Sequence, residues 1–214
     1  MNAFIRGSLA LFAFLTLSPA WAGLDESIAR LQSEWEQIKY KQPADRQEKA
    51  YEELTKDALA VRAENPDRPE ADIWYGIIVA SHAGAKGGLG ALSLAKDAKA
   101  ALEKAMARNP EALGGSAYVT LATLYYQVPG WPIGFGDKDK ARELLNRALA
   151  LNPRGIDSNF FMGDFLYRTG EYDKAKASLE LALQAPPRPN RPLADEGRRK
   201  EIEVLMAKVK DKLK

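Results

Sequence analysis

The sequence predicts an all-α protein, built as a right-handed solenoid of helical hairpins and closed by a C-terminal helix. Apolar residues recur every three or four positions through successive segments from residue 24 to residue 213, as they do along one face of a helix. Glycine or alanine recurs at matched positions of several segments, where paired helices would touch. The dipeptide Asn-Pro ends three segments, at residues 65–66, 109–110 and 152–153. Because one hairpin cannot bury its apolar face alone, the hairpins are expected to stack.

Residues 1–22 are typical of a Sec-type signal peptide. Arg6 supplies the positive n-region, residues 9–17 form a short apolar core, and Ala20 and Ala22 flank Trp21 in a small-residue cleavage site. Cleavage after Ala22 would release the chain into the periplasm. The apolar core is too short to cross a bilayer comfortably, so no integral membrane segment is expected in the mature chain.

Composition excludes several classes of function. The chain has 31 Lys and Arg against 29 Asp and Glu, a formal net charge of +2, which is too balanced to indicate nucleic-acid binding. It has no Cys and a single His, so disulfides, thiolate catalysis and zinc sites are not expected. With no nucleophile and base pattern, the sequence predicts a protein with no catalytic residue, metal or cofactor.

Residues 23–66 are expected to form an atypical N-terminal helical pair. Apolar residues recur at helical spacing through residues 24–41 and 44–64, but small contact residues are sparse there. Terminal units of a solenoid are often irregular because only one of their sides is covered by a neighbour. This pair is therefore interpreted as a cap on three further hairpins in residues 67–187.

The hairpin of residues 156–187 is the most regular. Small Gly163 and Ala175 allow two antiparallel helices to approach closely, Leu179 fills the space between hairpins, and Pro187 ends the second helix. This spacing resembles the tetratricopeptide (TPR) repeat, with Asn159 in place of the usual Trp. The resemblance implies a TPR-type solenoid whose first helices line a concave surface that binds a partner. The matching positions are Met162, Gly163, Leu166, Ala175, Leu179, Ala182 and Pro187.

The two preceding hairpins are longer than this one. If Trp74 takes the tryptophan position, Ile78 corresponds to Gly163 and lies twenty residues before Ala98. In the next hairpin Ala122 and Ala141 are nineteen residues apart, against twelve for Gly163 and Ala175. Both hairpins therefore contain about seven or eight extra residues between their helices, and stacking would place both insertions on one edge.

The two insertions differ in composition. Residues 83–90 are rich in glycine and predict a flexible loop, since neither a preceding strand nor a phosphate-binding motif supports an anion site. Residues 128–136 contain two prolines and three glycines, which favour a non-helical loop. The large apolar groups Trp131, Ile133 and Phe135 of this loop would either pack locally or face a partner.

The concave surface is expected to be rich in aromatic side chains with acidic edges. Helical spacing places Asp72, Tyr75, Val79 and His82 of the first helix, Ser116, Val119, Thr123 and Tyr126 of the second, and Asp157, Phe160, Asp164 and Tyr167 of the third on it. A protein or peptide partner is the predicted occupant, with a small apolar ligand as the alternative. The candidate binding residues are Tyr75, His82, Tyr126, Trp131, Phe135, Phe160, Asp164 and Tyr167.

Residues 188–214 are expected to be a proline-rich connector and a capping helix. Ile202, Leu205, Met206, Val209 and Leu213 form one apolar stripe, which would cover the end of the last hairpin. The signal peptide, the PGWPIGFGD insertion and this C-terminal segment resemble exported bacterial TPR proteins. More distantly, the repeats are similar to the T component of TRAP transporters, a lipoprotein, from which the absence of Cys departs. The resemblance implies a periplasmic scaffold rather than an enzyme.

Overall fold

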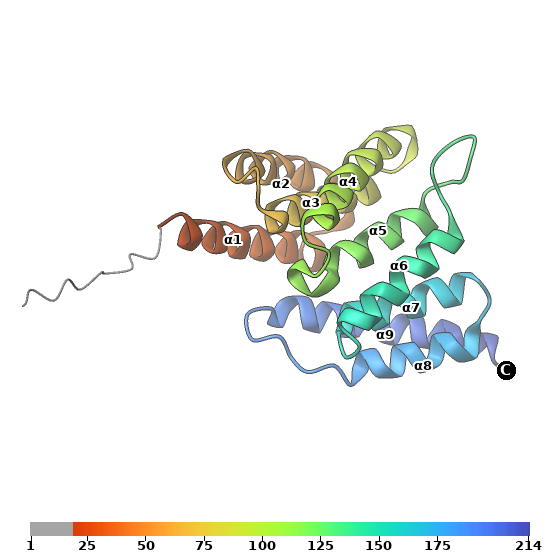
Figure 1. Cartoon of the computed structure of the whole chain (residues 1–214). Coiled ribbons are helices and arrows are strands. Elements are labelled where there is room, and N and C mark those ends of the chain that lie inside the picture. Colours follow the sequence, from red (N-terminus) through yellow and green to blue (C-terminus); the bar gives the residue numbers. More distant parts are fainter. Residues whose placement is uncertain (1–18) are drawn as a thin grey trace, which may run out of the picture.

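The computed structural model describes residues 19–214, which form nine α-helices and one short 3-10 helix (Figure 1). Within this range there is no strand and no helix long and apolar enough to cross a membrane. Most of the predicted signal peptide lies outside the described residues, and its predicted cleavage site falls in the first turn of α1. The helices are α1 (Pro19–Lys41), α2 (Ala44–Glu64), α3 (Pro69–Lys86), α4 (Gly88–Arg108), α5 (Ser116–Gln127), α6 (Lys138–Leu151), α7 (Ile156–Arg168), α8 (Tyr172–Leu183) and α9 (Pro192–Lys212).

Consecutive helices pack in pairs, α1 with α2, α3 with α4, α5 with α6 and α7 with α8, and each pair contacts the next. The predicted all-α hairpin solenoid is therefore confirmed. In two of the pairs, α3–α4 and α7–α8, the helices touch where a glycine meets a leucine. A Cβ added to Gly163 would lie 2.7 Å from Leu179 Cδ2, and one added to Gly76 would lie 2.7 Å from Leu102 Cγ. Only the missing side chain allows the helices to come this close.

The predicted register of α3 is wrong by two residues. Gly76 contacts Leu102 as Gly163 contacts Leu179, so Gly76 and not Ile78 is the equivalent position. The prediction placed Trp74 where TPR repeats carry tryptophan, but that position is Asp72, which is 1% exposed and receives an ion pair from Arg62. The corresponding Asn159 of α7 is likewise a buried polar residue, 2% exposed.

Two apolar cores share α3 as a common wall. Ile73 and Val79 of α3 belong to a large core that also contains residues of α4 to α9. Trp74 and Ile78, on the other side of the helix, belong to a smaller core formed with α1 and α2. The N-terminal pair is thus packed onto the repeats through α3.

The two insertions fold differently. The expected flexible loop at residues 83–90 is absent, because α3 continues to Lys86 and α4 begins at Gly88. Only Gly87 interrupts the helices, with φ of +63°, and its N–H donates to Ala83 O at 3.1 Å. The α5–α6 connection is non-helical, as predicted. Both connections lie at the same edge of the solenoid (Figure 1), which confirms their predicted placement.

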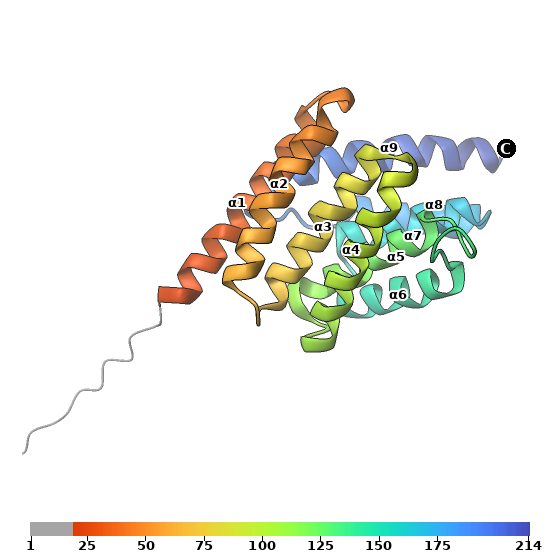
Figure 2. The ribbon, with the colours of Figure 1, turned by 90° about the horizontal axis from the view of Figure 1, so that it is seen from above.

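The C-terminal helix covers the last hairpin and also reaches the first. Ile202, Leu205, Met206 and Val209 of α9 are buried in the large core, as the cap prediction requires, whereas Leu213 follows the helix and stays exposed. Beyond that prediction, the N-terminal half of α9 contacts α1 (Figures 1 and 2). The first and last helices therefore meet at the inner face of the solenoid.

Candidate functional site: a groove closed by the first and last helices

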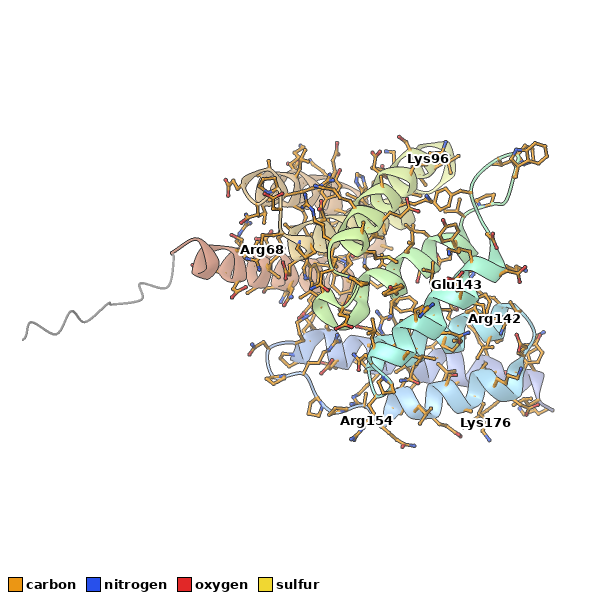
Figure 3. All side chains as sticks on the ribbon, in the orientation of Figure 1. Arg68, Lys96, Arg142, Glu143, Arg154 and Lys176 are labelled. Atoms are coloured by element: carbon orange, nitrogen blue, oxygen red, sulfur yellow. The ribbon has the colours of Figure 1, made fainter. Side chains whose placement is uncertain are left out.

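A groove of about 640 Å³ lies on the inner face of the solenoid. Its lining comes from α1, α2, α3, α5 and α7, together with α9 and the connector before it. Among the described residues, the outer helices α4, α6 and α8 contribute nothing to the lining; instead they carry charged side chains such as Lys96, Glu143 and Lys176 (Figure 3). The first helix of each repeat thus faces the groove, as the sequence predicts.

The floor of the groove is made of small residues and hydroxyl groups. Thr120 Oγ1 donates to Ser116 O at 3.1 Å, and Thr123 Oγ1 donates to Val119 O at 2.9 Å. Ser81 Oγ of α3 donates in the same way to a carbonyl of its own helix. Since each hydroxyl proton is used within its helix, the oxygens keep lone pairs that can accept hydrogen bonds from an occupant.

One wall of the groove is built on α7. The rings of Phe160 and Phe161 meet edge to face with centroids 5.0 Å apart. Asp164 accepts hydrogen bonds from Tyr126 Oη at 2.8 Å and from Arg168 Nε at 2.9 Å. Burial, followed by the neighbouring Asp164 carboxylate, raises the pKa of Tyr126, so its hydroxyl remains a donor.

Beside α7, the connector and α9 carry guanidinium groups that neutralise the predicted acidic edge. Asp157 accepts from Arg188 Nη1 and from Arg198 Nε, each at 2.8 Å. Burial alone would raise the pKa of Asp157, but the charges of Arg198 and Arg188 outweigh it and lower that pKa. Arg198 also lies over the ring of Phe160, 4.4 Å from the centroid. Both acidic residues of α7 that face the groove are therefore paired with arginine.

The eight candidate residues fall into three groups. Phe160 and Asp164 line the groove, and Tyr126 lies behind it, bonded to Asp164. The side chains of Tyr75, His82 and Tyr167 do not line it, and neither do those of Trp131 and Phe135. The lining of the groove therefore does not extend to the inserted loop.

The error on α3 follows from its register. Its groove-facing positions include Trp74, Ile77, Ser81 and Gly84, each two residues after a predicted position. Tyr75 instead lies under the guanidinium of Arg62, 4.8 Å from the ring centroid.

His82 and Tyr167 are likewise used for packing. Burial and the nearby charge of Lys86 lower the pKa of His82, which favours a neutral imidazole. Tyr167 packs against Tyr172 with ring centroids 5.8 Å apart. In residues 19–214 no cluster of His, Asp or Glu side chains is arranged to hold a metal ion.

The inserted α5–α6 loop divides into a packed base and an exposed tip. Phe135 packs edge to face on Tyr125 with centroids 5.6 Å apart, and Gly136 N donates to Pro129 O at 2.9 Å. Trp131 and Ile133 are 90% and 66% exposed. Of the two alternatives for this loop, local packing holds for Phe135, whereas Trp131 is free to face a partner.

Sequence reasoning missed the residues that α1, α2 and α9 bring to the groove. Trp35 and Tyr40 of α1, Tyr51 of α2 and the arginines 191 and 198 all line it. From the sequence, each of these aromatic residues is expected in the core, and each arginine is expected on the solvated surface. The one available signal was the concentration of arginine in and after the proline-rich connector.

Comparison with known proteins bears on the fold. Residues 133–194 match the tetratricopeptide repeat family. A thermophilic TPR protein of Thermus thermophilus has a similar structure, with a TM-score of 0.57 and 24% sequence identity over 88% of this chain and 91% of that chain. The chain has the TPR fold. A second comparison, with the crystal structure of MamA, gives a TM-score of 0.46 and 20% identity over 81% of this chain and 95% of that chain. No curated protein matches the chain.

The stacked hairpins of this fold create an extended concave surface. In this chain that surface is partly enclosed, since α9 crosses from the last repeat to α1. Any partner bound there meets three kinds of surface: hydroxyl oxygens on the floor, aromatic rings on the wall and arginines at the edge.

Proposed function

We propose that this chain is a non-enzymatic TPR scaffold that binds a peptide segment of a protein partner in the groove. The observation that carries the proposal is the groove of about 640 Å³ on the inner face of a TPR solenoid. This volume falls within the range of about 300–1,000 Å³ in which proteins enclose compact ligands. It suits a short segment of a partner better than a folded domain.

The lining favours a peptide over a small apolar ligand. Main-chain N–H groups of a peptide are donors, and the oxygens of Ser116, Thr120 and Thr123 are available acceptors. Phe160 and Phe161 provide an apolar surface for a side chain. Eight lining residues are charged, and an apolar solute would displace water from them without offering a polar contact in return.

The charged groups of the groove do not favour catalysis. A general base needs a pKa near the working pH, whereas the pKa of Asp157 is lowered by two arginines. Asp164 is engaged by Tyr126 and Arg168. These carboxylates hold the walls together, which supports a binding role.

A cysteine-directed photocrosslinker tests the groove, since the chain has no Cys of its own. Thr120→Cys places the probe on the groove floor, and Lys96→Cys places it on the outer helix α4 as a matched control. In periplasmic extract the probe at residue 120 is expected to capture a protein that the probe at residue 96 does not. Adding Thr123→Arg, which fills the groove, should abolish the adduct. Equal capture at both positions would show that the groove is not the binding surface.

We propose further that the scaffold works in the periplasm, because residues 1–22 have the three parts of a signal peptide. A C-terminally tagged chain is expected in the osmotic-shock fraction with Gly23 as its first residue. Ala22→Asp removes the small residue at the cleavage site and should leave the uncut form on the membrane. Wild-type protein that begins at Met1 and stays with the cells would contradict this localisation.

A further inference from the structure

The contact between α1 and α9 is polar where it closes the groove. Arg191, at the N-terminal cap of α9, pairs with the buried carboxylate of Glu36. Farther along, Lys39 Nζ lies 3.2 Å from a carboxylate oxygen of Glu201, and Tyr40 Oη donates to Glu201 at 3.5 Å. We call these contacts between residues 35–40 and residues 191–201 the latch.

The latch joins two helices that belong to different apolar cores, which meet at α3. The second half of α9 is fixed to the repeats by Ile202 and Val209, which are buried in the large core. Residues of α1 belong to the smaller core with α2 and one side of α3. Because neither core of the described residues spans both α1 and α9, opening the latch would cost ion pairs and ring contacts while leaving both cores intact.

Aromatic rings sit directly beneath the arginine of the latch. The guanidinium of Arg191 lies 5.2 Å from the ring centroid of Trp74 and 5.9 Å from that of Trp35. Nε1 of Trp35 donates to Ser81 Oγ at 2.8 Å. A change in the latch is therefore a change in the surroundings of these two tryptophans, and both line the groove.

The closed latch leaves the buried donor Trp74 Nε1 without a hydrogen bond within residues 19–214, although this side chain lines the groove. Tyr51 differs, because it lies near Ser81, whose Oγ accepts from Trp35 Nε1 and donates to Ile77 O but keeps a lone pair for Tyr51 Oη. A buried donor without a partner destabilises the state that contains it, so hydration or an occupant's acceptor would favour an open latch.

We propose that the α1–α9 latch opens and closes access to the inner groove. Opening hydrates Arg191, Glu36 and the unpaired Trp74 Nε1, which offsets the loss of the ion pairs. Closing restores the ion pairs and the cation–π contacts over Trp35 and Trp74. Because salt screens the more exposed Lys39–Glu201 pair of the latch, the open form should become more populated as ionic strength rises.

An engineered disulfide can hold the latch shut. A Cβ added to Gly197 would lie 2.5 Å from Cγ of Tyr40, so Cβ atoms at these two positions fall within disulfide range. The double variant Tyr40→Cys, Gly197→Cys is therefore expected to form the bond on oxidation and to release it on reduction. No native Cys competes for the pairing.

The readout is quenching of tryptophan emission by acrylamide in the full secreted chain that begins at Gly23, with Trp131→Phe added. Trp35 and Trp74 are then the remaining tryptophans. In the reduced form quenching should increase severalfold between low salt and about 1 M salt, where the screening length is about 3 Å. In the oxidised form it should stay at the low-salt level. Equal quenching of the two forms at both salt levels would overturn the proposal.

A single substitution gives a second test that does not depend on the disulfide. Glu36→Gln removes the charge that pairs with Arg191 and should raise quenching at low salt toward the wild-type level at high salt. Glu34→Gln is the matched control, because its pair with Arg30 is exposed and lies outside the latch. An unchanged Glu36→Gln variant would also overturn the latch. Neither measurement needs a partner, so the result is independent of the proposed peptide binding.

Discussion

The hairpins α3–α4 and α5–α6 contain extra residues at the same point of the repeat, yet these residues fold in opposite ways. In α3–α4 they lengthen the helices to 18 and 21 residues, with only Gly87 between them. In α5–α6 the helices have 12 and 14 residues, and residues 128–137 form a non-helical loop. The first insertion has alanine and lysine but no proline, whereas the second has two prolines. Proline, rather than the length of the insertion, decides between a longer helix and a loop.

Apart from their connections, both hairpins should lose stability when a side chain is added where their two helices touch. Gly76→Leu in α3 is expected to destabilise the chain by about 3 kcal/mol, since overpacking at a helix contact costs about 1–3 kcal/mol or more. Its added Cβ alone would meet Leu102 Cγ at 2.7 Å. Urea unfolding measures the change. Gly84→Leu, in the same helix with nothing within 4 Å of the added Cβ, is the control and should change stability little.

The turn of α5–α6 depends on close contact between backbone segments of the loop. A Cβ at Gly136 would overlap the carbonyl oxygen of Val128, so Gly136→Ala should cost about 2 kcal/mol in unfolding free energy. Gly130→Ala, whose added Cβ comes no nearer than 3.4 Å to Gly136 O, is the matched control. If both variants unfold like the wild type, the loop closes differently from the geometry described here.

The turn of α3–α4 depends on backbone conformation instead. Gly87 has φ of +63° and ψ of −178°, a region essentially restricted to glycine, and a Cβ there meets no atom within 4 Å. Gly87→Ala should therefore cost about 1–2 kcal/mol through strain alone. The loss should appear as faster amide exchange at the ends of α3 and α4. Unchanged exchange there would show that the turn tolerates a side chain.

Much of this fold could be predicted from periodicity. The all-α hairpin architecture and the close approach of two helices at Gly163 follow from the spacing of small and large apolar residues, although Leu179 packs on Gly163 within the hairpin and not between hairpins as predicted. The prediction of the α3 register was wrong because Trp74 was assigned to the position where TPR repeats carry tryptophan. In the structure Asp72 occupies that position. A glycine at residue 76 was the better guide, since only its missing side chain allows the helices to touch.

The candidate site was harder to predict than the fold. Phe160 and Asp164 were found because α7 follows the regular repeat. The closure of the groove by α1 and α9 was not predicted. Tyr40 and Glu201 are 161 residues apart, and the contacts between the two helices there are polar and ionic. Charged side chains on a helix usually indicate a solvated face, and no local pattern shows that two such faces meet.

The smallest expected effect separates the two roles within the α5–α6 loop. Phe135→Ala removes an edge-to-face contact with Tyr125 and should cost about 1 kcal/mol in thermal unfolding. Trp131→Ala should change stability by less than about 0.5 kcal/mol, because a side chain that is 90% exposed loses little packing. If Trp131 instead proves the more destabilising of the two, its ring must be covered in solution, and the tip of the loop would be packing rather than a surface open to a partner. If only Phe135→Ala lowers the stability, Trp131 and Ile133 are the residues of this insertion that the fold does not need for packing. The α3–α4 hairpin differs, because its extra residues continue the two helices.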